Sequence, residues 1–303
     1  MMRTGIRLSL RQRRWLVAYG FLALPLLFFL LIRIGPALFA FVVSAHRWDP
    51  LAERHPFVGL GNYQALLTDE TFHRALTNTW IYVLIGVPTS LVLGLAVALG
   101  LNQVKRFRGI YRVLYFIPYV TSLAAVSWVW RWMYSSPTGL FNDVLQGLGL
   151  PAQHFLGDPE QAIYAIIATN VWYTLGFQVL ISLTGLQTIP EVYYEAAAMD
   201  GAGRWQRLRH ITFPLLNPTL IFLLVLGVIS SLQVFTQVQN MSDQGRGGPL
   251  DSTISLVLYT YSRGFSSLPA ELGYASAIVV VLFVMILAVT IVQLRLLQRR
   301  VEY

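Results

Sequence analysis

The chain has 303 residues, of which 55% are hydrophobic and only 12% are charged, and its formal net charge is +8. Ordinary soluble domains carry about 25% charged residues, and the apolar residues of this chain come in long blocks, so composition excludes an ordinary soluble domain. The basic residues lie at the edges of these blocks, which indicates a membrane surface, and not a nucleic acid, as the partner. The absence of cysteine excludes disulfides, thiolate metal sites and cysteine nucleophiles, and the five histidines lack the paired spacing of a metal site.

Six apolar blocks reach the length of about 20 residues that a helix needs to cross a membrane. We therefore predict an all-α integral membrane protein with six transmembrane helices. The first block follows five arginines, as a signal peptide would, but its apolar run is about twice as long as a signal core, so we interpret it as an uncleaved anchor that kinks near Pro36. In chain order the predicted spans are 15–45, 77–101, 110–133, 161–186, 214–237 and 274–297.

Lysine and arginine gather on one side of this topology, and the side that they mark is the cytoplasmic one. They concentrate at both termini and in the connections after the second and fourth spans, whereas residues 134–160, between the third and fourth spans, contain none. Both termini are therefore predicted to be cytoplasmic, in agreement with an even number of spans. The predicted parts are a basic cytoplasmic N-terminus (1–14), a first transmembrane anchor helix (15–45), an extracytoplasmic loop (46–76), a five-helix core (77–297) that includes a cytoplasmic loop (187–213), and a cytoplasmic tail (298–303).

The predicted spans lack the groups that an enzyme or a proton-driven carrier would need. They contain no Asp or Glu, whereas proton-coupled carriers usually need a titratable carboxylate within the membrane; sodium coupling through backbone carbonyls stays open. Lys105 is the only lysine and Arg106 follows it, so no GxxxxGK[ST] loop exists and any ATP chemistry must belong to another polypeptide. With no paired-acid or Ser–His–Asp arrangement near the spans, we predict a non-catalytic chain without a cofactor or metal of its own.

The cytoplasmic loop between the fourth and fifth spans predicts a helix–turn–helix. Thr188 can cap the first helix, and Pro190 suits its first turn. Gly201 can end that helix in a left-handed conformation. A second short helix is expected over 204–212, before Pro214 opens the fifth span. Such a pair either lies on the lipid surface, where arginines are common, or protrudes as a docking surface for a partner.

The spacing of residues in this loop is specific. Glu195-Ala196-Ala197 is followed after three residues by Gly201, and after nine more by Ile211, one residue and Phe213-Pro214. This pattern resembles the EAA loop of the permease subunits of ABC importers, with Phe213 in place of the usual leucine and with the typical Asp200 before the glycine. The segments FVGLGNY (57–63), YRVLYFIPYV (111–120), GGP (247–249) and LGYASAI (272–278) resemble the maltose-permease-like family, which takes up carbohydrates and glycerol phosphate.

The resemblance implies a fold, an assembly and a mechanism. The implied fold is the transmembrane domain of a type I ABC importer, in the cytoplasmic (inner) membrane of a prokaryote. The implied assembly contains a second homologous permease, a dimer of ATP-binding subunits that bind ATP and Mg, and an extracytoplasmic solute-binding protein. In this family the EAA helix sits in a cleft of the ATP-binding subunit. By carry-over, Glu195 makes the polar contact to that subunit, Ala196 and Ala197 fit the cleft, and Gly201, preceded by Asp200, makes the turn.

Polar and aromatic residues in the spans suggest where a solute binds. On a helix, the three- and four-residue offsets between Ser230, Gln233, Gln237 and Asn240 would place them on one face of span five. Side-chain amides form hydrogen bonds with hydroxyl groups, and aromatic rings cover the apolar faces of sugars, so a neutral sugar is the predicted substrate. Alternatively, these polar residues hold helices together within the bundle or join them to the partner permease. The remaining candidates are Asn170, Tyr173, Thr174, Phe177 and Gln178 in span four, and Trp128, Arg131 and Trp132 in span three.

Several alternatives stay open at this point. A glycerol-phosphate permease, or a permease for an amino acid or peptide, would share the EAA loop, whereas a stand-alone carrier or channel would transport without ATP. Arg33, inside the first predicted span, has no explanation: it could snorkel, pair with a loop carboxylate or face the partner permease.

Overall fold

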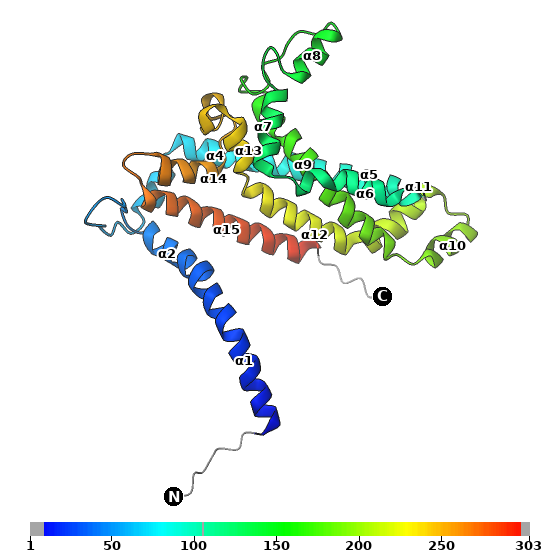
Figure 1. The fold of residues 1–303 in the computed structure, drawn as a ribbon, viewed down its shortest axis with the longest axis horizontal. Coiled ribbons are helices and arrows are strands. Elements are labelled where there is room, and N and C mark those ends of the chain that lie inside the picture. Colours follow the sequence, from blue (N-terminus) through cyan, green and yellow to red (C-terminus); the bar gives the residue numbers. More distant parts are fainter. Residues whose placement is uncertain (1–8, 105, 298–303) are drawn as a thin grey trace, which may run out of the picture.

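The computed structural model describes residues 9–104 and 106–297, and apart from an isolated antiparallel bridge between His46 and Phe57 their regular structure is helical (Figure 1). The prediction of an all-α fold is confirmed. The predicted tail 298–303 and residues 1–8 of the predicted N-terminus lie outside the described residues.

Five helical stretches in the described chain are long and apolar enough to cross a membrane. Two are single α-helices, and three contain a π-helical turn between α-helical pieces. In chain order they are α1 (Leu10–Phe29), η1 (Leu30–Ile34) and α2 (Gly35–Ser44); α4 (Glu70–Ile81), η2 (Tyr82–Gly86) and α5 (Val87–Gln103); α9 (Ala162–Gln187); α11 (Arg204–Arg207), η3 (Leu208–Thr212) and α12 (Phe213–Leu232); and α15 (Leu272–Leu297).

Each of the π turns in these three stretches ends two residues before a proline, which is Pro36, Pro88 or Pro214. A proline inside a helix has no N–H to donate, and its ring collides with the carbonyl of the preceding turn. A π turn widens the helix locally, so the helix continues past the ring. The π turn η1 lies just before Pro36, where a kink was predicted; the kink itself stays a prediction.

The prediction that the third span is a single helix is wrong. It consists of α6 (Arg108–Val120) and α7 (Leu123–Met133), which meet at 92°. Thr121, between them, has an extended backbone. The hydroxyl of Tyr173, in α9, donates hydrogen bonds to the carbonyls of Tyr119 (3.1 Å) and Thr121 (3.4 Å), so a neighbouring helix satisfies groups that the break leaves free.

The fifth predicted span also breaks, so the prediction that residues 230–240 share one helical face is wrong. α12 ends at Leu232, and α13 (Thr236–Met241) is a separate helix. The hydroxyl of Ser255 donates to the carbonyl of Val234 at 2.6 Å, which holds the chain between the two helices in place of a helical partner. A contact from a distant segment therefore determines this break.

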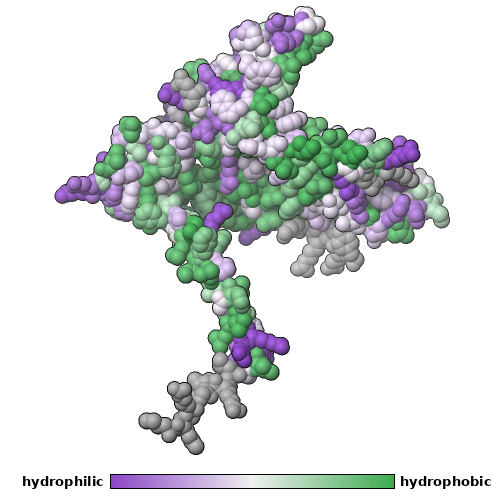
Figure 2. Space-filling view, in the orientation of Figure 1, coloured by the Kyte–Doolittle hydropathy of each residue, from purple (hydrophilic) through white to green (hydrophobic). Residues whose placement is uncertain are grey.

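Helices α5, α9, α12 and α15 run roughly along the long axis of the molecule, whereas α1 runs away from it on one side and α7 projects from it on the other, toward α8 (Leu140–Gly147) (Figure 1). α10 (Glu191–Met199) lies at one end of this axis and the loop after α2 at the opposite end. Hydrophilic residues are found at both ends of the long axis and on the part that projects from its middle, while apolar residues dominate much of the surface between the two ends (Figure 2). The shorter elements in the connections are α3 (Gly61–Leu66), α8 (Leu140–Gly147), η4 (Asp243–Gly245), η5 (Pro249–Asp251), α14 (Leu256–Tyr261) and η6 (Ser262–Ser266).

Glycines allow the helices to cross closely. A Cβ on Gly176, in α9, would collide with the backbone carbonyl of Tyr115, in α6, and a Cβ on Gly94, in α5, would collide with the side chain of Gln178. Small residues at such crossings let backbones approach each other in a membrane, where van der Waals packing replaces the hydrophobic effect between helices. α9 thus lies directly against both α5 and α6.

Asp69 ties three elements together just before α4 begins. Its carboxylate accepts hydrogen bonds from the hydroxyls of Tyr259, in α14, and Tyr274, in α15, and caps α4 by accepting from the backbone N–H of Phe72 at 3.1 Å. The Arg263 guanidinium lies 4.9 Å from the centre of the Tyr274 ring. Partial burial raises the pKa of Asp69, but the hydrogen bonds from both tyrosines and the backbone outweigh it and hold the pKa of this carboxyl below its usual value.

We expect Asp69→Asn to lower the thermal unfolding midpoint in detergent by about 2–4 °C. Because the pKa of Asp69 is lowered in the folded state, its carboxylate contributes stability that is fully present above the unfolded-state pKa of about 4 and is lost as the pH falls through the lowered value. The difference between wild type and variant should therefore be constant near neutral pH and shrink below about pH 4. Asp49→Asn is the control, since among the described residues Asp49 accepts only from the nearby backbone N–H of Leu51; an equal effect of both variants would contradict the role of Asp69.

Candidate functional site

The first candidate site is the loop around α10. Pro190 immediately precedes this helix, and Gly201 follows it with φ +77°, as predicted for a left-handed turn. The N–H of Ala202 donates to the carbonyl of Ala197 (2.8 Å) and the N–H of Gly201 to that of Ala198 (3.1 Å). This pair of bonds is the Schellman motif, which satisfies the last carbonyls of a helix and favours glycine at the left-handed position.

Two local predictions for this loop are wrong. Thr188 does not cap α10: it ends α9, and its hydroxyl donates to the carbonyl of Gly185 at 2.8 Å. The second helix is not a separate short element either, because α11 and η3 continue into α12, so that one helix runs from Arg204 to Leu232. The π turn before Pro214 explains why the proline does not start a new helix. The hydroxyls of Tyr194 and Thr212 lie 3.0 Å apart and join α10 to this long helix.

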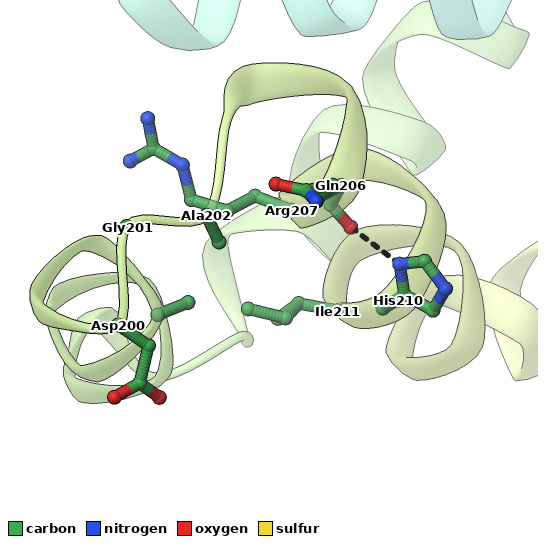
Figure 3. Close-up of a pocket in the computed structure, with 8 residues that line it drawn as sticks. Asp200, Gly201, Ala202, Gln206, Arg207, His210 and Ile211 are labelled. Carbon is green, nitrogen blue, oxygen red and sulfur yellow. Dashed lines mark hydrogen bonds between the residues drawn. The ribbon is translucent and has the colours of Figure 1, made fainter.

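A groove of about 330 Å³ separates α10 from the long helix (Figure 3). Ile211 lies at its centre, the Nδ1–H of His210 donates to the carbonyl of Gln206 at 3.0 Å, and the Asp200 carboxylate points away from Ile211. Ala197 is half-buried, whereas Glu195, Ala196 and Asp200 are exposed. The groove is lined by Ala197, Asp200, Gly201, Ala202, Gln206, Arg207, His210 and Ile211.

The second candidate site is a cavity of about 560 Å³ among α5, α9, α12 and the ends of α6 and α13. Five of the six residues predicted for a substrate path line it: Asn170, Tyr173, Gln178, Gln233 and Gln237. The amide of Gln237 donates to the side-chain oxygen of Asn170 at 2.8 Å. The cavity volume falls within the range of about 300–1,000 Å³ that is typical of small-molecule sites.

The cavity has an aromatic wall and an unsatisfied amide. The Tyr119 ring stacks on Phe177 with 5.1 Å between ring centres. Gln178 is only 4% exposed, and its side-chain oxygen has no hydrogen-bond partner among the described residues. No charged residue lines the cavity within the described chain. Since buried polar groups are normally hydrogen-bonded, the Gln178 oxygen is available to a ligand or water.

Ser230, Thr174 and Phe177, which were also candidates, line the same cavity, whereas Asn240, Trp128, Arg131 and Trp132 do not. Asn240 does not line the cavity; its backbone carbonyl accepts from the Arg131 guanidinium at 3.1 Å. Arg131 itself forms an ion pair with Asp243 at 3.0 Å and lies over Trp128. Tyr119 was not predicted for the cavity, although it belongs to the segment 111–120 that carries part of the family resemblance; the break after α6 brings its ring there.

Comparison with known proteins identifies the family. Residues 73–303 match the family model described as the inner membrane component of binding-protein-dependent transport systems. The chain belongs to this family. The permease is therefore a multi-pass inner-membrane component and a non-catalytic subunit of an importer, as predicted.

Individual relatives match this chain along nearly its whole length. The permease is 37% identical over 273 residues to the trehalose/maltose transport system permease protein MalF of Thermococcus litoralis, covering 90% of each chain. It is 33% identical to the sn-glycerol-3-phosphate transport system permease protein UgpA of Agrobacterium fabrum, covering 88% of the permease and 90% of the relative. A solved bacterial alginate ABC transporter, in complex with an alginate pentasaccharide-bound periplasmic protein, matches with a TM-score of 0.80 and 25% identity over 95% of each chain. The permease thus has the fold of an ABC importer transmembrane domain.

Proposed function

We propose that the permease forms half of the translocation path for a sugar or related polyol in an ATP-driven, binding-protein-dependent importer. The observation that carries the substrate class is the cavity, which has no charged residue among its described lining and is lined by the amides of Gln178, Gln233 and Gln237 together with the aromatic pair Tyr119 and Phe177. Amides donate to and accept from hydroxyls, and aromatic rings cover the apolar faces of sugars. Names of relatives such as the trehalose/maltose permease support the same class.

Glycerol phosphate is the second candidate substrate, because a relative that shares 33% of its residues is named for it. A phosphorylated solute calls for arginine or lysine donors, and the cavity has neither among the described residues that line it. The cavity therefore favours the neutral solute. A stand-alone carrier is distinguished by its energy source, since the proposed permease takes up solute only when the ATPase is present.

The α10 loop is proposed to couple the permease to a dimer of ATP-binding subunits, which hold the ATP and Mg. Glu195 and Ala196 are exposed on a short helix, and Asp200 is exposed directly after it, before the turn at Gly201; a partner cleft can receive such a helix. The remaining proposed partners are a second homologous permease and an extracytoplasmic solute-binding protein. Reconstitution of all four components in proteoliposomes, with uptake measured with and without ATP, tests the assembly.

Replacing Gln237 with leucine should raise the KM for uptake about three- to tenfold, because one side-chain hydrogen bond contributes about 0.5–1.5 kcal/mol. ATPase activity without the solute-binding protein should be unchanged. The matched control is Asn240→Ala, which removes a side chain that does not line the cavity. Equal effects of the two variants on KM would show that the cavity does not bind the solute.

A further inference from the structure

A groove of about 500 Å³ runs between α6 and α9, which lie side by side (Figure 1). Its lining residues on α6 are spaced three or four positions apart, so they form one face of that helix. The residues that α9 contributes to the groove differ from those that it contributes to the solute cavity, so the groove is a separate site. The groove is lined by Tyr111, Leu114, Tyr115, Pro118, Trp172 and Leu175.

The groove faces away from the rest of the described chain. Tyr111, Leu114 and Trp172 are exposed, as is Ile117 on the same helix. α6 starts from the basic connection after the second predicted span, which the distribution of charge places on the cytoplasmic side, and ends at the break after Val120. The groove therefore opens toward the cytoplasmic side of the membrane, to lipid or to another chain.

The sequence concentrates positive charge where α6 begins: Lys105, Arg106, Arg108 and Arg112 fall within eight residues. Arg112 is half-buried, its Nε atom is shielded, and its guanidinium has no hydrogen bond or ion pair to another residue in the described chain. On the helix it is next to Tyr111 and one turn from Tyr115, so it borders the groove. A basic cluster beside an apolar groove complements a ligand that is both apolar and anionic.

The aromatic residues of the groove also carry unpaired polar tips. The hydroxyls of Tyr111 and Tyr115 and the indole N–H of Trp172 have no hydrogen-bond partner among the described residues. Such side chains suit a boundary where one end is apolar and the other is polar. A hydrocarbon chain alone would leave these three donors unsatisfied, whereas the ester and phosphate oxygens of a phospholipid accept hydrogen bonds from them.

We propose that this groove binds an anionic phospholipid of the cytoplasmic leaflet, with an acyl chain along Leu114 and Pro118 and the phosphate at Arg112. A guanidinium donates two parallel hydrogen bonds to a phosphate, and anionic lipids of this leaflet attract basic segments next to a membrane span. An apolar groove also fits a helix of another protein. The basic cluster favours the lipid, because membrane helices seldom carry the negative charge that would complement it.

The test measures phospholipid binding to the complete importer in detergent by native mass spectrometry. The probes are phosphatidylglycerol and phosphatidylcholine with the same acyl chains, and wild type should bind phosphatidylglycerol more tightly. Arg112→Gln should weaken the tightest phosphatidylglycerol binding about fivefold, and Arg112→Lys should restore most of it. The control is Arg295→Gln, since Arg295 is exposed in the last turn of α15, outside the groove; it should bind like wild type.

Leu114→Trp tests whether an acyl chain occupies the groove. Leu114 is 58% exposed, so a larger ring can fill the groove without displacing α9. Binding of both lipids should fall, while the importer elutes as wild type does. Unchanged lipid binding together with loss of the partner permease would show that a protein helix occupies the groove, and would overturn the inference. Equal binding of the two lipids by wild type would also overturn it, because the headgroup would then make no charged contact.

Discussion

Gly201→Trp should abolish ATP-dependent uptake and binding-protein-stimulated ATP hydrolysis, while the permease remains folded in the membrane. Gly201 has φ +77°, and a Cβ added there would have no atom within 4 Å, so the indole would project from the turn into open space beside α10. A left-handed backbone costs a residue with a side chain about 1–2 kcal/mol, and the ring would occupy the space beside α10 where the ATP-binding subunit is proposed to dock.

The series Gly201→Asn, Gly201→Val and Gly201→Trp separates these two causes. Asparagine tolerates the left-handed conformation and should keep most of the uptake, valine adds strain with little bulk, and tryptophan adds both. Uptake and ATPase activity are measured on the same proteoliposomes. Wild-type uptake by the tryptophan variant would show that the turn does not contact the ATPase.

Gly176→Val should leave almost no folded permease, because the substituent would collide with the backbone carbonyl of Tyr115. A backbone group cannot rotate away as a side chain can, so α6 and α9 would have to separate. Overpacking typically costs about 1–3 kcal/mol and occasionally more, and separation would also open the cavity lined by Tyr119 and Tyr173. Detergent-extracted yield and the elution profile of the purified protein measure the effect.

Gly100→Ala is the matched control for this crossing. Gly100 lies in α5, and a Cβ there would meet nothing within 4 Å. Alanine is favoured over glycine in a helix by about 0.5–1 kcal/mol, so this variant should be as stable as wild type or more so. Gly176→Ala should instead lower the thermal midpoint. If both alanine variants behave alike, the close crossing of α6 and α9 does not limit stability.

The helix–turn at α10 could be predicted because its signals are local. Pro190 and Gly201 act on their own backbone and on residues within one turn, and the structure has the helix between them. Five of six residues predicted for the substrate path line one cavity, because polar groups in an apolar span must face protein or water. Asn240 was misplaced, because its position depends on the break after Leu232.

The sequence by itself determined the number of apolar stretches, the all-α class and the family, because hydrophobic length and the spacing in the loop 195–214 are properties of consecutive residues. Tertiary structure alone decided where those stretches bend. At the 92° break after Val120, the hydroxyl of Tyr173 donates to carbonyls that have lost a helical partner. At the break after Leu232, the hydroxyl of Ser255 does the same for the carbonyl of Val234. Within a membrane a helix can stop only where another part of the protein takes over its hydrogen bonds, and which part does so depends on contacts between residues far apart in the chain.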